Sequence, residues 1–357
     1  MPQNAQPPVN ASSPGRAGAP GAPGAPGAPE MMPELILARS IAPSDDSTSI
    51  VIPPAVEPQI RIGAVGVTAH TNLVYATRED ADGQDLPLRL DLLVPQTPGD
   101  KPVVVYLPGG GFVLSTKEAA FERRSYVAEA GYAVASVEYR TVRNGALYLD
   151  AVADAKAAIR FLREHAGEYG LDASNVALWG ESAGGYLASM VGTTNGIAEF
   201  EGSDKSRFSS EVQAVVNQFG LSNLLKFIDD FDPESQQALL RPGTAASAFV
   251  FGPAANQSLA DDPDAVAAAD PTTYVTAETP PFVHFHGSAD NVVPPGQSLL
   301  LHTALLEQGV ESTRYVLTGA KHGDLSAMLG EPEAALPWST EEILGYLTGF
   351  LAKHLHS

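Results

Sequence analysis

Residues 180–184, Gly-Glu-Ser-Ala-Gly, stand between an apolar run at 176–179 and a helix-like segment at 186–190. This pattern predicts a sharp turn from a strand into a helix, with Ser182 at its tip. A serine hydroxyl attacks only when it stands clear of the backbone, and the flanking glycines let strand and helix close around the turn. A chain with 33 glycines can also produce this pentapeptide by chance, so the rest of the sequence decides its meaning.

A glycine cluster follows a second predicted strand, at 103–107, and reads Pro108-Gly109-Gly110-Gly111-Phe112. Only glycine lets successive backbone N–H groups turn toward one point, and an ordinary tight turn would need a single glycine. We therefore expect the N–H groups of Gly110 and Gly111 to stabilise a negative oxygen beside Ser182. The N–H of Ala183, at the start of the following helix, is the expected third donor.

Two later strand candidates, at 282–286 and 313–317, are each followed by a loop with a titratable side chain. The first loop carries Asp290 and the second carries His322. The order serine, acid, histidine predicts that His322 takes the proton of Ser182 and that Asp290 orients the imidazole. Asp324 is the weaker alternative for the acid, because it shares the loop of the histidine.

Other histidines offer less chemistry. His284 and His286 alternate onto one strand face and could mimic a pair of metal ligands, but no third ligand is evident. We expect both to pack structurally, and we expect neither a metal nor another cofactor.

Several of these segments together resemble the carboxylesterases of the hormone-sensitive-lipase-like type, most of all the branch with bifunctional feruloyl and acetyl xylan esterases. The likeness spans roughly residues 72–355. It implies an α/β-hydrolase fold and a serine carboxylesterase that acts on small acyl or aromatic esters. Pro108 is a departure, since the family usually has histidine there; proline can also stiffen the loop by fixing φ. The segments that carry the resemblance are 106–112, Glu138-Tyr139-Arg140, 150–192, 286–290 and Val293-Pro294.

Alternating strand and helix patterns predict one α/β domain, 61–357, with a doubly wound, mostly parallel sheet and a small helical cap around 222–275. Residues 1–60 are expected to form a disordered Gly/Ala/Pro-rich tail and an N-terminal arm. We expect the substrate to contact Phe112, Glu181 and Val292, which neighbour the catalytic positions. The helices are expected at 118–130, 151–168, 185–193, 297–308 and 340–354.

The formal net charge of −21 disfavours nucleic acid and anionic lipid headgroups as partners and favours a neutral small-molecule ester. The sequence contains no run of 18 or more apolar residues that could span a membrane, and residues 1–30 lack the pattern of a signal peptide. A cytoplasmic protein is the expectation, with secretion after signal removal as the alternative. The absence of cysteine excludes a thiol nucleophile and leaves the redox compartment open, and the oligomeric state is open too.

Two other functions stay open at this point. A serine peptidase related to oligopeptidases would use the same three residues, but it would need a group that holds a peptide terminus. A non-catalytic ligand-binding protein would keep the fold, although such proteins typically lose the serine or the histidine.

Overall fold

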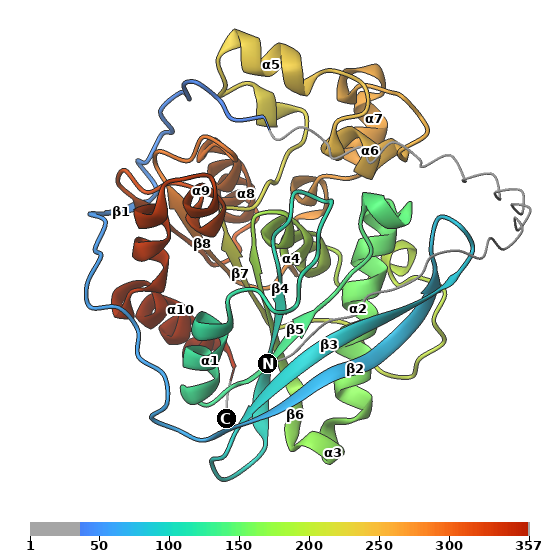
Figure 1. The fold of residues 1–357 in the computed structure, drawn as a ribbon, viewed down its shortest axis with the longest axis vertical. Coiled ribbons are helices and arrows are strands. Elements are labelled where there is room, and N and C mark those ends of the chain that lie inside the picture. Colours follow the sequence, from blue (N-terminus) through green and yellow to red (C-terminus); the bar gives the residue numbers. More distant parts are fainter. Residues whose placement is uncertain (1–35, 356–357) are drawn as a thin grey trace, which may run out of the picture. The chain divides into compact units, whose positions relative to one another are not determined.

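A nine-stranded mixed sheet forms the centre of the fold (Figure 1). A computed structural model describes residues 36–355, and the Gly-Ala-Pro repeats expected to form a disordered tail lie outside them. The strand order is β1-β9-β8-β7-β6-β4-β5-β3-β2, and only the pairs β2/β3 and β3/β5 are antiparallel. The expected doubly wound, mostly parallel sheet is therefore confirmed. The strands are β1 (Ile50–Ile52), β2 (Val67–Glu79), β3 (Asp85–Pro95), β4 (Lys101–Leu107), β5 (Ala133–Val137), β6 (Leu171–Glu181), β7 (Ala214–Gln218), β8 (Phe282–Gly287) and β9 (Ser312–Leu317).

Helices cover both faces of this sheet (Figure 1). All five expected helices are present, with ends that differ by a few residues, and a short α3 continues the second. They are α1 (Phe121–Glu129), α2 (Tyr148–Glu164), α3 (Ala166–Tyr169), α4 (Ala183–Thr193), α8 (Gly296–Glu307) and α10 (Glu341–His354). The helix α9 (Gly323–Met328) and a 3₁₀ segment, η6 (Pro332–Ser339), add to the C-terminal part of the fold.

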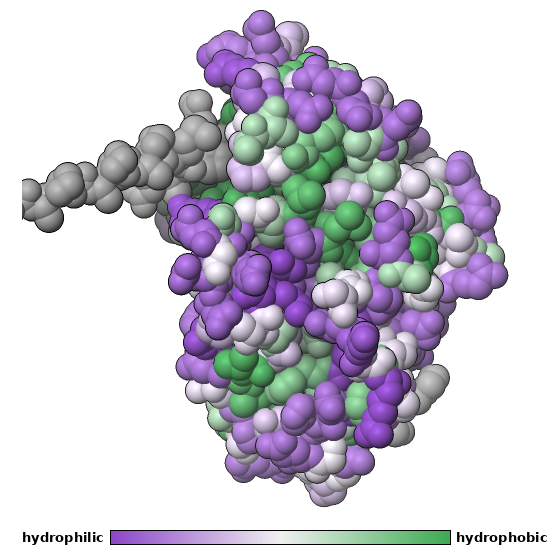
Figure 2. All heavy atoms as spheres, turned by 90° about the vertical axis from the view of Figure 1, so that its right-hand side faces the viewer, coloured by the Kyte–Doolittle hydropathy of each residue, from purple (hydrophilic) through white to green (hydrophobic). Residues whose placement is uncertain are grey.

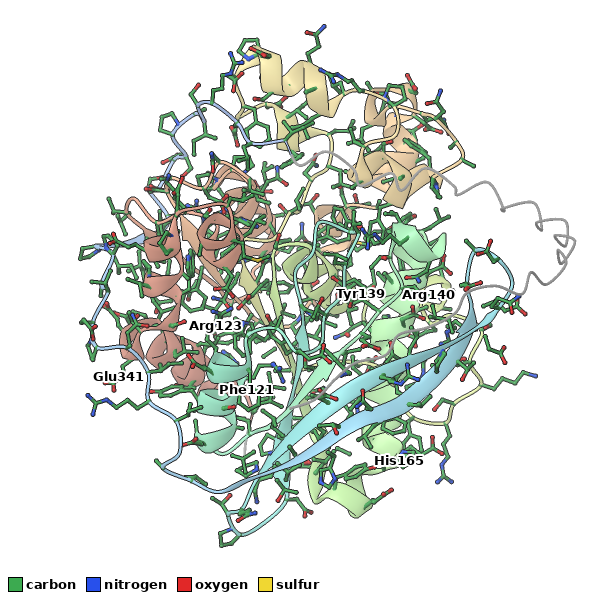
Figure 3. All side chains as sticks on the ribbon, in the orientation of Figure 1. Phe121, Arg123, Tyr139, Arg140, His165 and Glu341 are labelled. Atoms are coloured by element: carbon green, nitrogen blue, oxygen red, sulfur yellow. The ribbon has the colours of Figure 1, made fainter. Side chains whose placement is uncertain are left out.

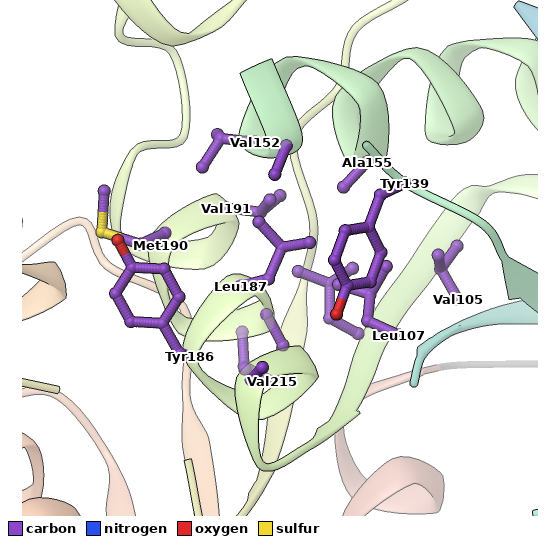
Figure 4. Packing of buried hydrophobic residues seen from close by; sticks show 14 of the residues in the cluster. Val105, Leu107, Tyr139, Val152, Ala155, Tyr186, Leu187, Met190, Val191 and Val215 are labelled. Carbon is purple, nitrogen blue, oxygen red and sulfur yellow. The ribbon is translucent and has the colours of Figure 1, made fainter. Parts of the chain in front are cut away.

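Side chains of strand β4 contribute to the hydrophobic core on both faces of the sheet. Successive side chains of a strand point to opposite sides of the sheet. Val103, Val105 and Leu107 accordingly belong to the apolar cluster formed with α2, α4 and α8. Val104 and Tyr106 belong to the cluster formed with α1 and α10. Figure 4 shows the first cluster, in which Val105 and Leu107 lie near side chains of α2 and α4. A strand buried on both sides reads as a continuous apolar run, which is why it was predictable.

Residues 36–60 contribute to the fold in two places. Strand β1 pairs in parallel with β9 at one edge of the sheet, with Val51 opposite Val316. Nearer the start of this segment, the N–H of Ala38 donates to the carbonyl of Asn291, in the loop that carries Asp290. The N-terminal arm therefore covers a sheet edge and reaches a loop of the candidate site.

Three short helices fill the insertion expected around 222–275: α5 (Pro233–Leu239), α6 (Ala245–Phe251) and α7 (Pro263–Ala267). They lie together above one end of the sheet (Figure 1). The two ends of the insertion meet where the N–H of Leu224 donates to Asp270 Oδ1 at 2.7 Å. Asp270 is only 1% exposed. One buried carboxylate thus ties the entry of the cap to its exit.

Asp270 predicts a pH-dependent stability. Burial raises its pKa to about 7, although the hydrogen bond from the Leu224 amide opposes the shift. The folded state therefore keeps a proton that the unfolded chain releases near pH 4, so stability falls as pH rises from about 4 to about 7. The loss is at most about 4 kcal/mol. Asp270→Asn, which can still accept the Leu224 N–H, is expected to melt higher than the parent at pH 8. Equal melting-temperature differences at pH 5 and pH 8 would contradict this.

None of the helices within residues 36–355 is both long enough and apolar enough to cross a membrane. On the face shown in Figure 2, hydrophilic residues predominate at the periphery, with hydrophobic areas between them. Apolar side chains scattered over a protein surface are common and need no special partner.

Candidate active site

Ser182 lies at the junction of β6 and α4, as the pentapeptide predicts. Its backbone has φ 54° and ψ −121°, a conformation that residues other than glycine rarely adopt. The flanking glycines are required by close approach: a Cβ on Gly180 would overlap the Gly184 carbonyl, and one on Gly184 would overlap the Leu107 carbonyl. The strained turn leaves the Ser182 side chain partly exposed while its neighbours are buried.

His322 connects Ser182 with Asp290 by two hydrogen bonds. Its Nε2 lies 2.8 Å from Ser182 Oγ, and its Nδ1 lies 2.6 Å from Asp290 Oδ2. The exposed fraction is 1% for His322 and zero for Asp290. The structure therefore brings together three residues that are 140 and 32 positions apart in sequence. Asp324, the alternative acid, instead pairs with Arg123.

The Asp290 carboxylate is held by its own loop. Its Oδ1 accepts the N–H groups of Val292 and Val293, each at 3.0 Å. Its Oδ2 lies 3.5 Å from Nε2 of His286, which also contacts the Val293 carbonyl at 2.9 Å. Burial alone would raise the pKa of Asp290, but the neighbouring His322 and His286 hold it well below its usual value. The carboxylate is therefore ionised and fixed in orientation.

The glycine loop presents free amides. The N–H groups of Gly110, Gly111 and Ala183 have no hydrogen-bond acceptor within residues 36–355. Gly110 and Gly111 have φ values of 156° and 60°. A Cβ on Gly110 would overlap the Leu114 carbonyl, so only glycine fits there. These amides can donate to an oxygen atom of a bound substrate.

The segment that follows β5 holds the glycine loop in place, although the loop has Pro108 where the related family usually has histidine. The Tyr139 hydroxyl donates to the Pro108 carbonyl at 2.7 Å. Thr141 Oγ1 donates to the Val113 carbonyl, and the N–H of Val142 donates to the Phe112 carbonyl, both at 3.0 Å. Figure 4 shows the Tyr139 ring beside Leu107, at the end of β4. The loop is thus held by side-chain and backbone contacts that do not require histidine at position 108.

The three expected substrate contacts have different surroundings. Phe112 is buried and stacks on Phe249 of the cap, with ring centroids 4.5 Å apart. Val292 is 9% exposed, and its amide holds Asp290. The Glu181 carboxylate is buried and pairs with Arg123 at 3.0 Å, and its expected contact with the substrate stays a prediction.

Three residues near the site were not singled out for it from sequence. Phe219, at the end of β7, packs its ring 4.7 Å from the His322 ring. The His286 ring lies 3.5 Å from the Asp290 carboxylate. Its position four residues before Asp290, in the His-Gly-Ser-Ala-Asp segment, could have indicated this contact. Arg123 contacts Glu181 and Asp324, and no sequence pattern indicates these ion pairs.

His284 and His286 do not form a metal centre with a third residue. Among residues 36–355, no group of three or more histidine, aspartate or glutamate side chains is arranged to hold a metal ion. His284 stacks on Phe282 and is fully buried, and burial holds its pKa well below the usual value.

Comparison with known proteins places this geometry among esterases. The sequence profile of the BD-FAE family matches residues 90–305, which is more than half of the chain. A probable isoprenylcysteine alpha-carbonyl methylesterase of Arabidopsis thaliana is 30% identical over 254 residues, covering 70% of this chain and 52% of its own length. The chain thus spans about half the length of the curated relatives it matches.

Two solved structures show the same fold. A truncated carbohydrate esterase from gut microbiota superposes with a TM-score of 0.67 at 24% identity, covering 80% of this chain and 95% of its own. A propionate-bound thermophilic esterase from Thermogutta terrifontis superposes with a TM-score of 0.60 at 25% identity, covering 81% of this chain and 96% of its own.

Proposed function

The chain belongs to the BD-FAE family of hormone-sensitive-lipase-like α/β-hydrolases, and on this premise we propose that it hydrolyses carboxylic esters through an acyl-enzyme on Ser182. The observation that carries the proposal is the hydrogen-bonded chain from Ser182 through His322 to Asp290, with distances of 2.8 and 2.6 Å. Nucleophile, base and orienting acid at such distances are the signature of an activated serine.

In the acylation step, Ser182 Oγ attacks the ester carbonyl carbon while its proton moves to His322 Nε2. Asp290 Oδ2 accepts a hydrogen bond from Nδ1–H and stabilises the imidazolium that forms. The carbonyl oxygen becomes negative and receives hydrogen bonds from the free amides of Gly110, Gly111 and Ala183. The carbon–oxygen bond to the alcohol then breaks, and His322 returns its proton to the leaving oxygen.

Deacylation repeats these steps with water as the nucleophile. Water adds to the acyl carbon and gives its proton to His322 Nε2. Collapse of the second tetrahedral intermediate releases the carboxylic acid, and Ser182 Oγ recovers the proton. The buried Asp290 stays ionised throughout, because two amides and two histidines contact it.

The proposed substrates are esters with a small acyl or an aromatic acyl group, such as acetyl or feruloyl esters. A propionate-bound esterase among the similar proteins supports a small acyl group, and the names carbohydrate esterase and methylesterase support ester hydrolysis without specifying the acyl group. The formal net charge of −21 further disfavours polyanionic substrates. The intact hydrogen-bonded chain also argues against a protein that kept the fold and lost the reaction.

A substrate panel tests the proposal. We expect hydrolysis of p-nitrophenyl acetate and propionate, with kcat/KM falling toward octanoate. Methyl ferulate and acetylated xylan are included to separate aromatic from sugar esters. Ser182→Ala protein supplies the blank, and aminoacyl-anilides test the peptidase alternative. Hydrolysis of the anilides alone, or of no substrate above the blank, would contradict the proposal.

A further inference from the structure

Arg123 lies on α1, where Figure 3 labels it. Its ion pairs with Glu181 and Asp324 bridge the two segments that carry Ser182 and His322. Its Nη2 lies 3.0 Å from Glu181 Oε2 and 2.7 Å from Asp324 Oδ2, and its Nη1 donates to Asp324 Oδ1 at 3.2 Å. Glu181 immediately precedes Ser182, and Asp324 follows His322 by two residues. One guanidinium therefore connects the end of β6 with the first turn of α9.

The sheet topology explains why such a connection is needed. Strand β6 leads to Ser182 and β9 leads to the loop of His322, and β7 and β8 lie between them. With about 4.8 Å between neighbouring strands, the two strands are about 14 Å apart. No backbone ladder joins them directly, so loops and side chains must set the 2.8 Å distance between Ser182 and His322. Phe219, at the end of β7, fills part of the space by packing on the His322 ring.

Burial shields one half of the Arg123 bridge from solvent, because the Glu181 side chain is buried whereas the Asp324 side chain is 48% exposed. Arg123 is 6% exposed and Glu181 is 7% exposed, so solvent screens their attraction little. Although burial would lower it, the carboxylates of Glu181 and Asp324 hold the pKa of Arg123 above its usual value. A guanidinium can bind two carboxylates in fixed directions, whereas an ammonium group is a single point charge. Arginine therefore fixes the directions of this double contact better than lysine does.

We propose that Arg123 is a positioning residue, which keeps Ser182 and His322 at reacting distance by clamping Glu181 and Asp324 together. This role rests on the proposed function, and it acts through the two carboxylates without contact to the substrate. A misplacement of reacting groups by about 1 Å can lower a rate by about a hundredfold. Loss of the clamp should therefore slow the chemical step more than it weakens substrate binding.

Arg160 offers a matched control. It is 5% exposed, lies on α2, and likewise bridges two carboxylates, Glu201 at 2.7 Å and Asp204 at 3.5 Å. Its partners belong to the 201–204 loop and not to the site. Arg123→Met and Arg160→Met remove the same kind of buried ion pair, and both are expected to lower the melting temperature.

The experiment measures kcat and KM for p-nitrophenyl acetate, with melting temperatures, in the parent and four variants. We expect Arg123→Met to lower kcat by roughly 10- to 100-fold with KM within about twofold, Arg123→Lys to recover part of the loss, and Arg160→Met to keep kcat within about twofold. Asp324→Asn, at a half-exposed position where folding is not at risk, is expected to lower kcat about three- to tenfold.

The possible outcomes distinguish failure of the positioning role of Arg123 from failure of the proposed esterase function. Equal kcat in the Arg123 and Arg160 variants and unchanged kcat in Asp324→Asn would overturn the clamp while leaving the esterase proposal intact. An inactive parent protein would overturn the esterase proposal, and the clamp with it. If Arg123→Met fails to fold, the kcat values of Arg123→Lys and Asp324→Asn replace it in this comparison. Parental kcat in both of them would then overturn the positioning role.

Discussion

Replacing Ser182 with alanine is expected to lower kcat for p-nitrophenyl esters by about 10⁴- to 10⁶-fold. The variant loses the nucleophile, so no acyl-enzyme can form, and only the amides of the glycine loop and substrate binding remain. The fold should persist, because the Ser182 side chain makes one hydrogen bond, to His322, and alanine fits the same turn as well as serine does. The measurement compares kcat and melting temperature with those of the parent.

Ser189, seven residues further along α4, is the matched control for this variant. Its hydroxyl is buried, donates to the Gly185 carbonyl and accepts from Asn217. Ser189→Ala is expected to lose stability of about 1–2 kcal/mol while kcat changes little. If Ser182→Ala kept more than a few per cent of the parental kcat, another residue would have to be the nucleophile.

Replacing Asp290 with asparagine is expected to lower kcat by about 10⁴-fold at neutral pH. The asparagine oxygen can still accept the amides of Val292 and Val293, so the loop keeps its anchor. The amide nitrogen then faces His322 Nδ1 and favours the tautomer whose Nε2 carries a proton. Such an imidazole cannot accept the proton of Ser182. The variant and the parent are compared by kcat on the same ester.

The same substitution has a stability effect with a definite sign. The pKa of Asp290 lies below its usual value, so the ionised carboxylate stabilises the fold above about pH 4 and less so as pH falls further. Asp290→Asn should therefore melt lower than the parent at pH 7, and the difference should shrink in acid. Full activity in this variant would exclude Asp290 as the orienting acid and return attention to Asp324.

The fold was predictable where strands are buried on both faces. The apolar run 103–107 and the mainly apolar segment 282–286 become β4 and β8, because helices cover them on both sides. The antiparallel hairpin of β2 and β3 was not singled out, since β2 carries many exposed polar side chains and lacks such a run. Strand β1 has only three residues, and its pairing with β9 depends on tertiary contacts.

The candidate site was predictable for a related reason. Ser182, Asp290 and His322 each follow a strand of the parallel sheet, and the carboxyl ends of such strands meet at one edge. Local patterns cannot reveal contacts between distant segments. Arg123 is 58 residues from Glu181 and 201 from Asp324, so no local pattern could indicate that it pairs with both.

A fluorophosphonate identifies the nucleophile directly, because it forms a stable covalent adduct with an activated serine. The protein is incubated with the reagent, and the adduct is counted by intact mass and located by peptide mapping. We expect one adduct per chain, on Ser182, formed in parallel with loss of ester hydrolysis, absent in Ser182→Ala and strongly slowed in Asp290→Asn. Ester hydrolysis that continues with Ser182 fully modified, or a single adduct on another residue, would contradict this expectation.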